Sequence, residues 1–110
     1  MIVKPEWLDK IYEDKDHEIR GQPCHSKKGK RIYFCPSEES AVTGTAILAD
    51  CLGPLTQAQF DQLRPRHKVP GASQYAKTYA WVLKQTRRLE PRPIVRKHGS
   101  VVWQIGPGGA

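Results

Sequence analysis

Long apolar runs are absent from this chain of 110 residues. No stretch approaches the roughly 18 apolar residues of a membrane-spanning helix, so the sequence excludes such a helix and predicts no membrane partner. The first six residues also lack the basic start, apolar stretch and small-residue cleavage site of a signal peptide. We therefore expect no secretion by that route and a cytoplasmic protein.

Residues that hold metals and cofactors are scarce. The chain has three cysteines, Cys24, Cys35 and Cys51, and an odd count without close pairing argues against a disulfide framework and for a reducing compartment. His17 and His25 lie near two of them, but the spacing of a zinc site is missing, so we expect no metal. Cys51 lies in an apolar stretch, which indicates a small core residue rather than a nucleophile. No glycine-rich phosphate loop precedes a helix, so we also expect no cofactor.

Acidic residues are few compared with basic ones. The chain has 11 Asp and Glu against 18 Lys and Arg, which gives a net charge of +7. The first 20 residues hold six acids and four bases, whereas the remainder holds five acids and 14 bases. Such a basic surface attracts polyanions, chiefly nucleic acid, although a solubilising surface without a partner fits the charge equally well.

Two helices are expected. A proline at its first position and apolar residues on one face predict a helix over residues 5–13. Thr56 and Gln59 have the spacing of a capping box at the start of a second helix over residues 56–64. Pro65 is expected to end that helix.

Strands are expected where β-favouring residues cluster between turn signals. Gly44, in the middle of the longest one, indicates a bulge or a sharp bend. Residues 85–93 are basic and are expected to form a loop.

Short strands with a bent central strand favour an α+β, mainly β fold: a barrel of five to six strands with two or more flanking helices. We expect one domain over residues 1–110, with a frayed tail at 106–110. The expected strands cover residues 17–21, 31–35, 41–51, 78–84, 94–97 and 101–105.

A compact polar motif, Lys15-x-x-Glu18-Ile19-Arg20, is the first candidate site. Glu18 and Arg20 share one side of an expected strand, and Ile19 lies on the other. The planar guanidinium of Arg20 can hold a phosphate or a base edge. Lys15 can contact a phosphate, or act as a base if desolvation lowers its pKa. An exposed surface ion pair is the alternative interpretation of this motif.

Aromatic residues form the second candidate. Aromatic side chains beside basic ones can stack on bases, but in alternating strands they more often belong to the core. We assign Trp103 to the core and expect Tyr79 and Trp81, which share a strand face, to be buried. Tyr75 lies in a polar connection and is the aromatic residue that we expect to face a ligand.

Basic runs in three separate segments form the third candidate. Each run alone reads as a solvated surface, but together they can contact the phosphates of an RNA if the fold makes them contiguous. The expected phosphate-backbone contacts are Lys27, Lys28, Lys30, Arg31, Arg66, Lys68, Arg87 and Arg88.

An ordered series of short motifs covers residues 4 to 105. The series comprises Lys4-Pro5-x-Trp7, Lys15-x-x-Glu18-Ile19-Arg20, Gly44-Thr45, Tyr79-Ala80-Trp81-Val82-Leu83, Pro91-x-Pro93, Lys97-x-Gly99 and Trp103. In order and spacing it resembles the small bacterial-type ASCH domains of the PUA-like superfamily. The resemblance implies a β-barrel with flanking helices and a cleft for RNA or a nucleotide, with Lys15, Glu18 and Arg20 at the cleft. Glu13 stands where the segment of this family has a glycine.

The same resemblance carries an alternative to binding. One related branch is similar to small amidohydrolases that act on N4-acetylcytidine through a Lys, a Thr and a Glu. Its Lys matches Lys15, but its nucleophilic Thr falls on Glu18, which has no hydroxyl group. Other ASCH proteins are linked to ribonuclease activity, which needs a general acid and a general base near the phosphate. The residues that can supply such groups, or bind the nucleotide, are Lys15, Glu18, Arg20, His67 and Tyr75.

Binding needs only the cations that are present, whereas catalysis needs a positioned nucleophile or base. We therefore predict that the protein binds RNA or a modified nucleotide through a basic cleft. A small hydrolase that uses the same cleft, with Lys15 and Glu18 as catalytic residues, is the alternative. No obligate protein partner is indicated.

Overall fold

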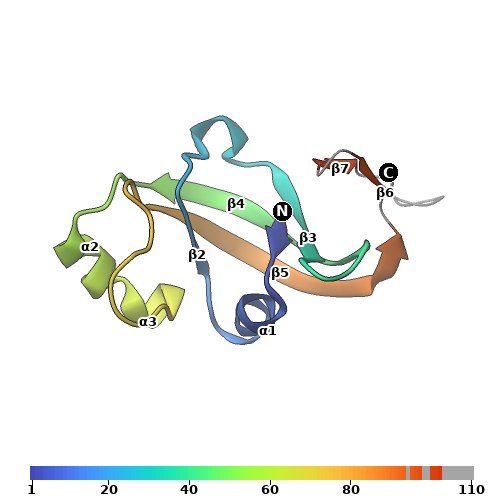
Figure 1. The fold of residues 1–110 in the computed structure, drawn as a ribbon, viewed down its shortest axis with the longest axis horizontal. Coiled ribbons are helices and arrows are strands. Elements are labelled where there is room, and N and C mark those ends of the chain that lie inside the picture. The colour runs from blue at the N-terminus through green and yellow to red at the C-terminus, as the bar shows by residue number, and fades with distance from the viewer. Residues whose placement is uncertain (94, 98–99, 103–110) are drawn as a thin grey trace.

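The computed structural model describes residues 1–93, 95–97 and 100–102. Five strands form a mixed sheet in the order β1-β3-β4-β5-β2, in which only the β1–β3 pair is parallel (Figure 1). The chain is thus α+β and mainly β, as predicted. The elements are β1 (Ile2–Val3), α1 (Pro5–Glu13), β2 (His17–Arg20), the 3-10 helix η1 (His25–Lys27), β3 (Arg31–Pro36), β4 (Ala41–Leu52), α2 (Gln57–Gln62), α3 (Arg64–His67), β5 (Tyr79–Pro93), β6 (Val95–Lys97) and β7 (Ser100–Val102).

The sheet is open between its two edge strands. In the part of the chain that the structure describes, β1 and β2 form no ladder with each other, so the expected closure into a barrel is not seen. A side chain crosses the gap instead, because Arg20 Nη2 on β2 donates a hydrogen bond of 2.6 Å to the carbonyl oxygen of Ile2 on β1. The gap between the edge strands is therefore bridged by a cationic side chain.

Strand β1 was not predicted, because its two residues are too few to show any alternation. It is held by parallel pairing with β3. The backbone N–H of Cys35 donates to the Met1 carbonyl, and that of Ser37 donates to the Val3 carbonyl, each at 2.9 Å. These bonds place the start of α1 beside the sheet.

Strand β5 is longer than the sequence indicated. The prediction of a loop over residues 85–93 is wrong, because β5 runs for 15 residues to Pro93 and pairs with β4 along this stretch. Residues 85–93 of β5 are exposed or half-buried, so their polar, basic composition comes from lying away from the core and not from a loop conformation. Irregular register near Gly44 confirms the predicted bulge. A Cβ at Gly44 would lie 2.0 Å from the hydroxyl of Tyr12, so glycine is needed there for the helix to approach.

The two faces of the sheet are covered by different helices. Leu8 and Ile11 of α1 are buried on one face, and Phe60 of α2 packs with Ile19 and Ala80 on the other. Helix α1 has the predicted bounds, and Glu13, at the position of the family's glycine, is simply its last residue. Tyr79, Trp81 and Cys51 are buried, as predicted. The three cysteines are free thiols.

The second predicted helix is divided in two. Its capping box is confirmed: the Thr56 hydroxyl accepts from the Gln59 N–H at 3.1 Å, and the Gln59 side chain accepts from the Thr56 N–H at 2.8 Å. Helix α2 ends at Gln62, and Pro65 lies in the first turn of α3. The expectation that Pro65 ends the helix is therefore wrong, because a proline in a first turn gives up no helical hydrogen bond.

Two strands were expected after residue 93. They correspond to β6 and β7, which form an antiparallel pair. Trp103 and the tail at 106–110 lie outside the described residues.

Candidate functional site

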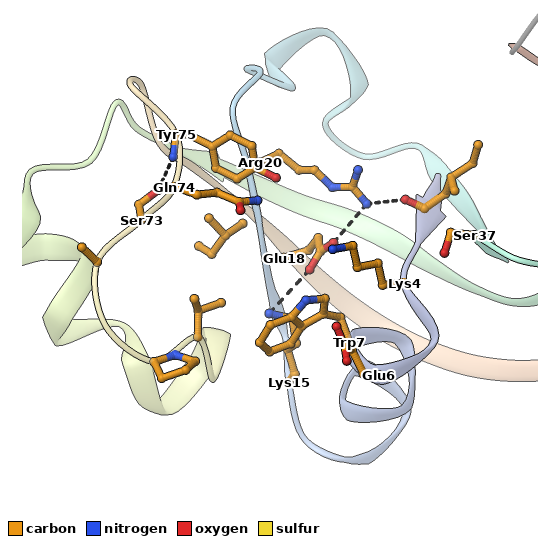
Figure 2. Close-up of a pocket in the computed structure, with 15 residues that line it drawn as sticks. Lys4, Glu6, Trp7, Lys15, Glu18, Arg20, Ser37, Ser73, Gln74 and Tyr75 are labelled. Carbon is orange, nitrogen blue, oxygen red and sulfur yellow. Dashed lines mark hydrogen bonds and ion pairs between the residues drawn. The ribbon is translucent and has the colours of Figure 1, made fainter.

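A cavity of about 550 Å³ lies at the gap between the edge strands (Figure 2). That volume is in the range of small-ligand sites. We call residues 69–75, which form one side of it, the wall loop. The lining residues are Ile2 of β1; Lys4, Glu6 and Trp7 at the start of α1; Lys15, Glu18, Ile19 and Arg20 of the β2 segment; Ser37; and Val69, Pro70, Ala72, Ser73, Gln74 and Tyr75 of the wall loop. The cavity thus brings together Lys15, Glu18, Arg20 and Tyr75, which the sequence singled out.

Three charged side chains form a row along the cavity. Lys15 Nζ lies 3.5 Å from Glu18 Oε1, and Arg20 Nη2 lies 3.0 Å from Glu18 Oε2, so each carboxylate oxygen faces one cation. Glu18 and Arg20 project to the same side because they are two residues apart on a strand. The side chain of Lys15 is 0% exposed and that of Glu18 is 8% exposed. This burial excludes the alternative of an exposed surface ion pair for the motif.

Lys15 is enclosed by three partners. Its ammonium donates to the backbone carbonyl of His67, contacts Glu18, and lies 5.1 Å from the centre of the Trp7 ring. One hydrogen bond, one ion pair and one aromatic ring therefore surround the ammonium. Burial lowers the pKa of Lys15 below its ordinary value, while the Glu18 carboxylate opposes that change. Lys15 therefore holds Glu18 in place in this arrangement.

Arg20 is the more accessible cation. Its side chain is 29% exposed. Nη2 donates a hydrogen bond to the Ile2 carbonyl and forms an ion pair with the Glu18 carboxylate, and these two contacts hold the guanidinium in place. Nε is buried and has no hydrogen-bond partner among the described residues. A guanidinium has five N–H bonds, so Arg20 retains donors for an incoming acceptor.

Two aromatic rings flank the charged row. Tyr75 packs so closely on Gly21, at the end of β2, that a Cβ there would lie 2.8 Å from the Tyr75 ring. Trp7 lies over Lys15, at the other end of the row, and Figure 2 shows the two rings on opposite sides of Glu18. The sequence analysis named Trp7 in a motif of the resemblance but did not count it among the site residues. Its place in the Lys4-Pro5-x-Trp7 motif was the signal that could have assigned it to the site.

His67 does not line the cavity, although the sequence suggested it as a nucleotide contact. Its ring is buried and stacks on Phe60 with 4.2 Å between centres. The Val69 N–H donates to Nδ1 at 2.9 Å, so Nδ1 carries no proton, and Nε2–H donates to the Phe60 carbonyl at 2.7 Å. Burial lowers the pKa of His67. The residue holds Lys15 through its carbonyl and the wall loop through its ring, so its role is to position them.

The predicted phosphate contacts lie outside the cavity lining and occupy separate parts of the fold (Figure 1). Lys27, Lys28 and Lys30 lie in and after η1, and Arg31 begins β3. Arg66 and Lys68 lie at α3, whereas Arg87 and Arg88 lie on the outer half of β5. The structure therefore distributes these cations over three regions.

Most of these cations have partners within the protein. Carboxylates pair with Lys28, Arg66 and Lys68, at 2.9, 2.7 and 3.2 Å from Asp50, Asp16 and Asp14 respectively. Aromatic rings lie under two others: Lys27 is 5.4 Å from the centre of Trp81, and Arg88 is 4.4 Å from that of Tyr12. Arg31 makes a long hydrogen bond of 3.4 Å to Thr45. Exposed pairs of this kind exchange easily with solvent ions, so they leave these side chains available to an anionic partner.

Other kinds of site find little support in the described part of the chain. There, no group of three or more His, Cys, Asp and Glu side chains is placed to share a metal ion. Among the same residues, no helix has the length and apolar character required to cross a membrane. A scan against protein-family models gives no match to the chain, and a search of curated proteins gives none either. The resemblance to ASCH domains therefore stays a prediction.

Proposed function

We propose that this protein binds RNA, or a nucleotide, through the cavity beside β2. The observation that carries the proposal is the Arg20 guanidinium. It is fixed by Glu18 and by the Ile2 carbonyl, yet remains partly exposed with donors to spare. A planar, preoriented guanidinium is suited to a phosphate or to the edge of a base.

The other lining residues support the same ligand class. Three cations, Lys4, Lys15 and Arg20, line the cavity against two carboxylates, Glu6 and Glu18, so the lining has an excess of positive charge. The flanking rings offer surfaces on which a base can stack. The cations outside the cavity can contact neighbouring phosphates of a longer RNA.

The resemblance to ASCH domains points to the same class of ligand. Its most compact motif, Lys15-x-x-Glu18-Ile19-Arg20, supplies the charged row of the cavity. We propose accordingly that the fold is PUA-like. The five strands then correspond to the barrel of that superfamily, and Arg20 bridges the opening that is left between β1 and β2. Three buried free thiols suit the reducing, cytoplasmic setting expected for it.

Titration with a short single-stranded RNA tests the proposal. Arg20→Ala is expected to weaken binding by about tenfold or more, because a charge-assisted contact is lost. Lys84→Ala is the matched control, since it removes one exposed positive charge from β5 outside the cavity lining. Affinity is also expected to fall steeply between about 50 and 200 mM salt. Equal effects of the two substitutions, or flat salt dependence, would contradict the proposal.

A hydrolase that uses the same cavity is the second candidate. It is favoured by Lys15, because a lysine whose pKa is lowered by burial can serve as a base. Binding ranks first because the Lys15 ammonium is fully buried among protein partners, and because Glu18 has no hydroxyl for nucleophilic attack.

Incubation with labelled RNA and with N4-acetylcytidine, with and without a chelator, separates the two candidates. Product that disappears in Lys15→Met would support the hydrolase. A shift of the RNA without any product would support binding alone.

A further inference from the structure

We propose that the cavity takes two consecutive nucleotides of a single strand, with one base on Trp7 and the other on Tyr75. The inference rests on the proposed function and makes it more specific, because it distinguishes a strand from a mononucleotide. We call the two rings the Trp7 station and the Tyr75 station.

The stations are too far apart for one base. Tyr75 is anchored on Gly21, and Trp7 is anchored on Lys15, whose ammonium contacts Glu18. Glu18 lies on β2 and Gly21 directly follows its last residue, Arg20; three residues along a strand span about 10 Å at roughly 3.3 Å per residue. Stacked bases are about 3.4 Å apart, so a single base that stacks on one ring leaves the other unoccupied. Strand β2 therefore sets a spacing that a dinucleotide can fill.

Each ring is held by the protein and remains partly accessible. Trp7 rests over the Lys15 ammonium, and Tyr75 rests against the backbone of Gly21; both rings are only half-buried. Rings held in this way are already in position for stacking, so a base that binds them pays little for ordering the protein. A second cation near Trp7, Lys10, is exposed at 6.0 Å from the ring centre and can move aside.

The charge between the stations suits the linking phosphate. Arg20 lies between Glu18 and Gly21 in the chain, and its guanidinium is the accessible cation of the row. Lys4, which is exposed at the start of α1, adds a second cation to the cavity lining. From one end to the other the features are thus the Trp7 ring, the Lys15–Glu18–Arg20 row and the Tyr75 ring; the row has one positive charge more than its single carboxylate balances, which suits one phosphate linking two bases.

The test compares ligands on the unaltered protein. Five ligands are titrated at one salt concentration: adenosine, AMP, ApA, dApdA and an oligoadenylate of seven nucleotides. We expect ApA to bind about tenfold or more tightly than AMP, since stacking of each base contributes about five- to 100-fold. Comparison of ApA with dApdA shows whether the strand is RNA or DNA. Tighter binding of ApA supports RNA. Equal binding of the two dinucleotides overturns RNA as the specific ligand but still supports the two stations.

Variants then assign the stations. Trp7→Leu and Tyr75→Leu are each expected to reduce the affinity for ApA to that for AMP, whereas Trp7→Phe and Tyr75→Phe, which keep a ring, are expected to retain the preference for ApA. Thermal unfolding of the same preparations identifies any variant that fails to fold. The comparison of ligands on the unaltered protein does not depend on that outcome.

The outcomes separate this inference from the proposed function. If the oligoadenylate binds but ApA binds no better than AMP, the two stations are wrong and the RNA-binding cavity stands. If none of the ligands binds, and uridine and guanosine counterparts also fail, both proposals are wrong.

Discussion

The cavity and the outer half of β5 both carry arginines, but the two regions use them differently. At the cavity, Arg20 is fixed by two acceptors and Glu18 is enclosed between two cations. On β5, Arg87 and Arg88 are both exposed, and the guanidinium of Arg88 lies over the ring of Tyr12. A count of basic residues treats these positions alike. Burial distinguishes them, because desolvated charges interact strongly only with partners placed at the correct distance, whereas exposed ones are screened.

Removal of Glu18 should have the largest effect on stability. Glu18→Ala leaves the buried Lys15 ammonium and the Arg20 guanidinium without their shared carboxylate. We expect a loss of about 3 kcal/mol or more in the free energy of unfolding, measured with urea. Asp50→Ala is the control, because it removes the carboxylate partner of an exposed cation, Lys28, and one acceptor of the Cys51 N–H, and we expect a much smaller loss, of about 1 kcal/mol. A similar loss in both variants would remove the distinction between the regions.

His67 should make stability depend on pH. Burial holds its pKa below the ordinary 6.5, so as pH falls below 6.5 the unfolded chain takes up a proton that the folded chain does not. Stability is therefore expected to fall from pH 7.5 to 5.5. The fall should be smaller in His67→Ala, which at pH 7.5 should itself be about 2 kcal/mol less stable because two buried hydrogen bonds are lost. Urea unfolding at both pH values measures this, and an equal fall in the variant would exclude His67 as the cause.

The motif around β2 could be predicted from the sequence because it depends on local geometry. Residues 18 and 20 must share a face of a strand, and Thr56 and Gln59 must meet if a helix starts there. The burial of Lys15 could not be predicted, because its partners His67 and Trp7 come from elements that are brought to it only by the fold. A pattern in the sequence gives which side chains share a face, but not what covers that face.

The less accurate predictions share the same physical cause. Residues 85–93 are basic and nonalternating, so local pattern indicated a loop, but pairing with β4 supplies the backbone hydrogen bonds that make them a strand. His67 lies among basic residues in the sequence and was suggested as a nucleotide contact. Its ring is instead buried by stacking on Phe60 of α2. In both cases a tertiary contact overrides the local signal.

The smallest effect is expected from the cations in and directly after η1. Neutralisation of Lys27, Lys28 and Lys30 together should weaken binding of all RNAs by only a few fold and reduce the dependence on salt, because phosphate contacts position a strand without specifying its bases. Titrations with several sequences at two salt concentrations measure both. Loss of binding for one sequence alone would show that these lysines read bases.

Chemical-shift mapping compares the two regions most directly. Amide spectra are recorded during titration of the isotope-labelled protein with a short single-stranded RNA. The predicted result is that the largest shifts fall on Trp7, on residues 18–21 and on the wall loop at 69–75, with small shifts on residues 84–92. Shifts that cluster on residues 84–92, or on residues 25–31, and leave Arg20 unchanged would contradict the proposal that the cavity is the binding site.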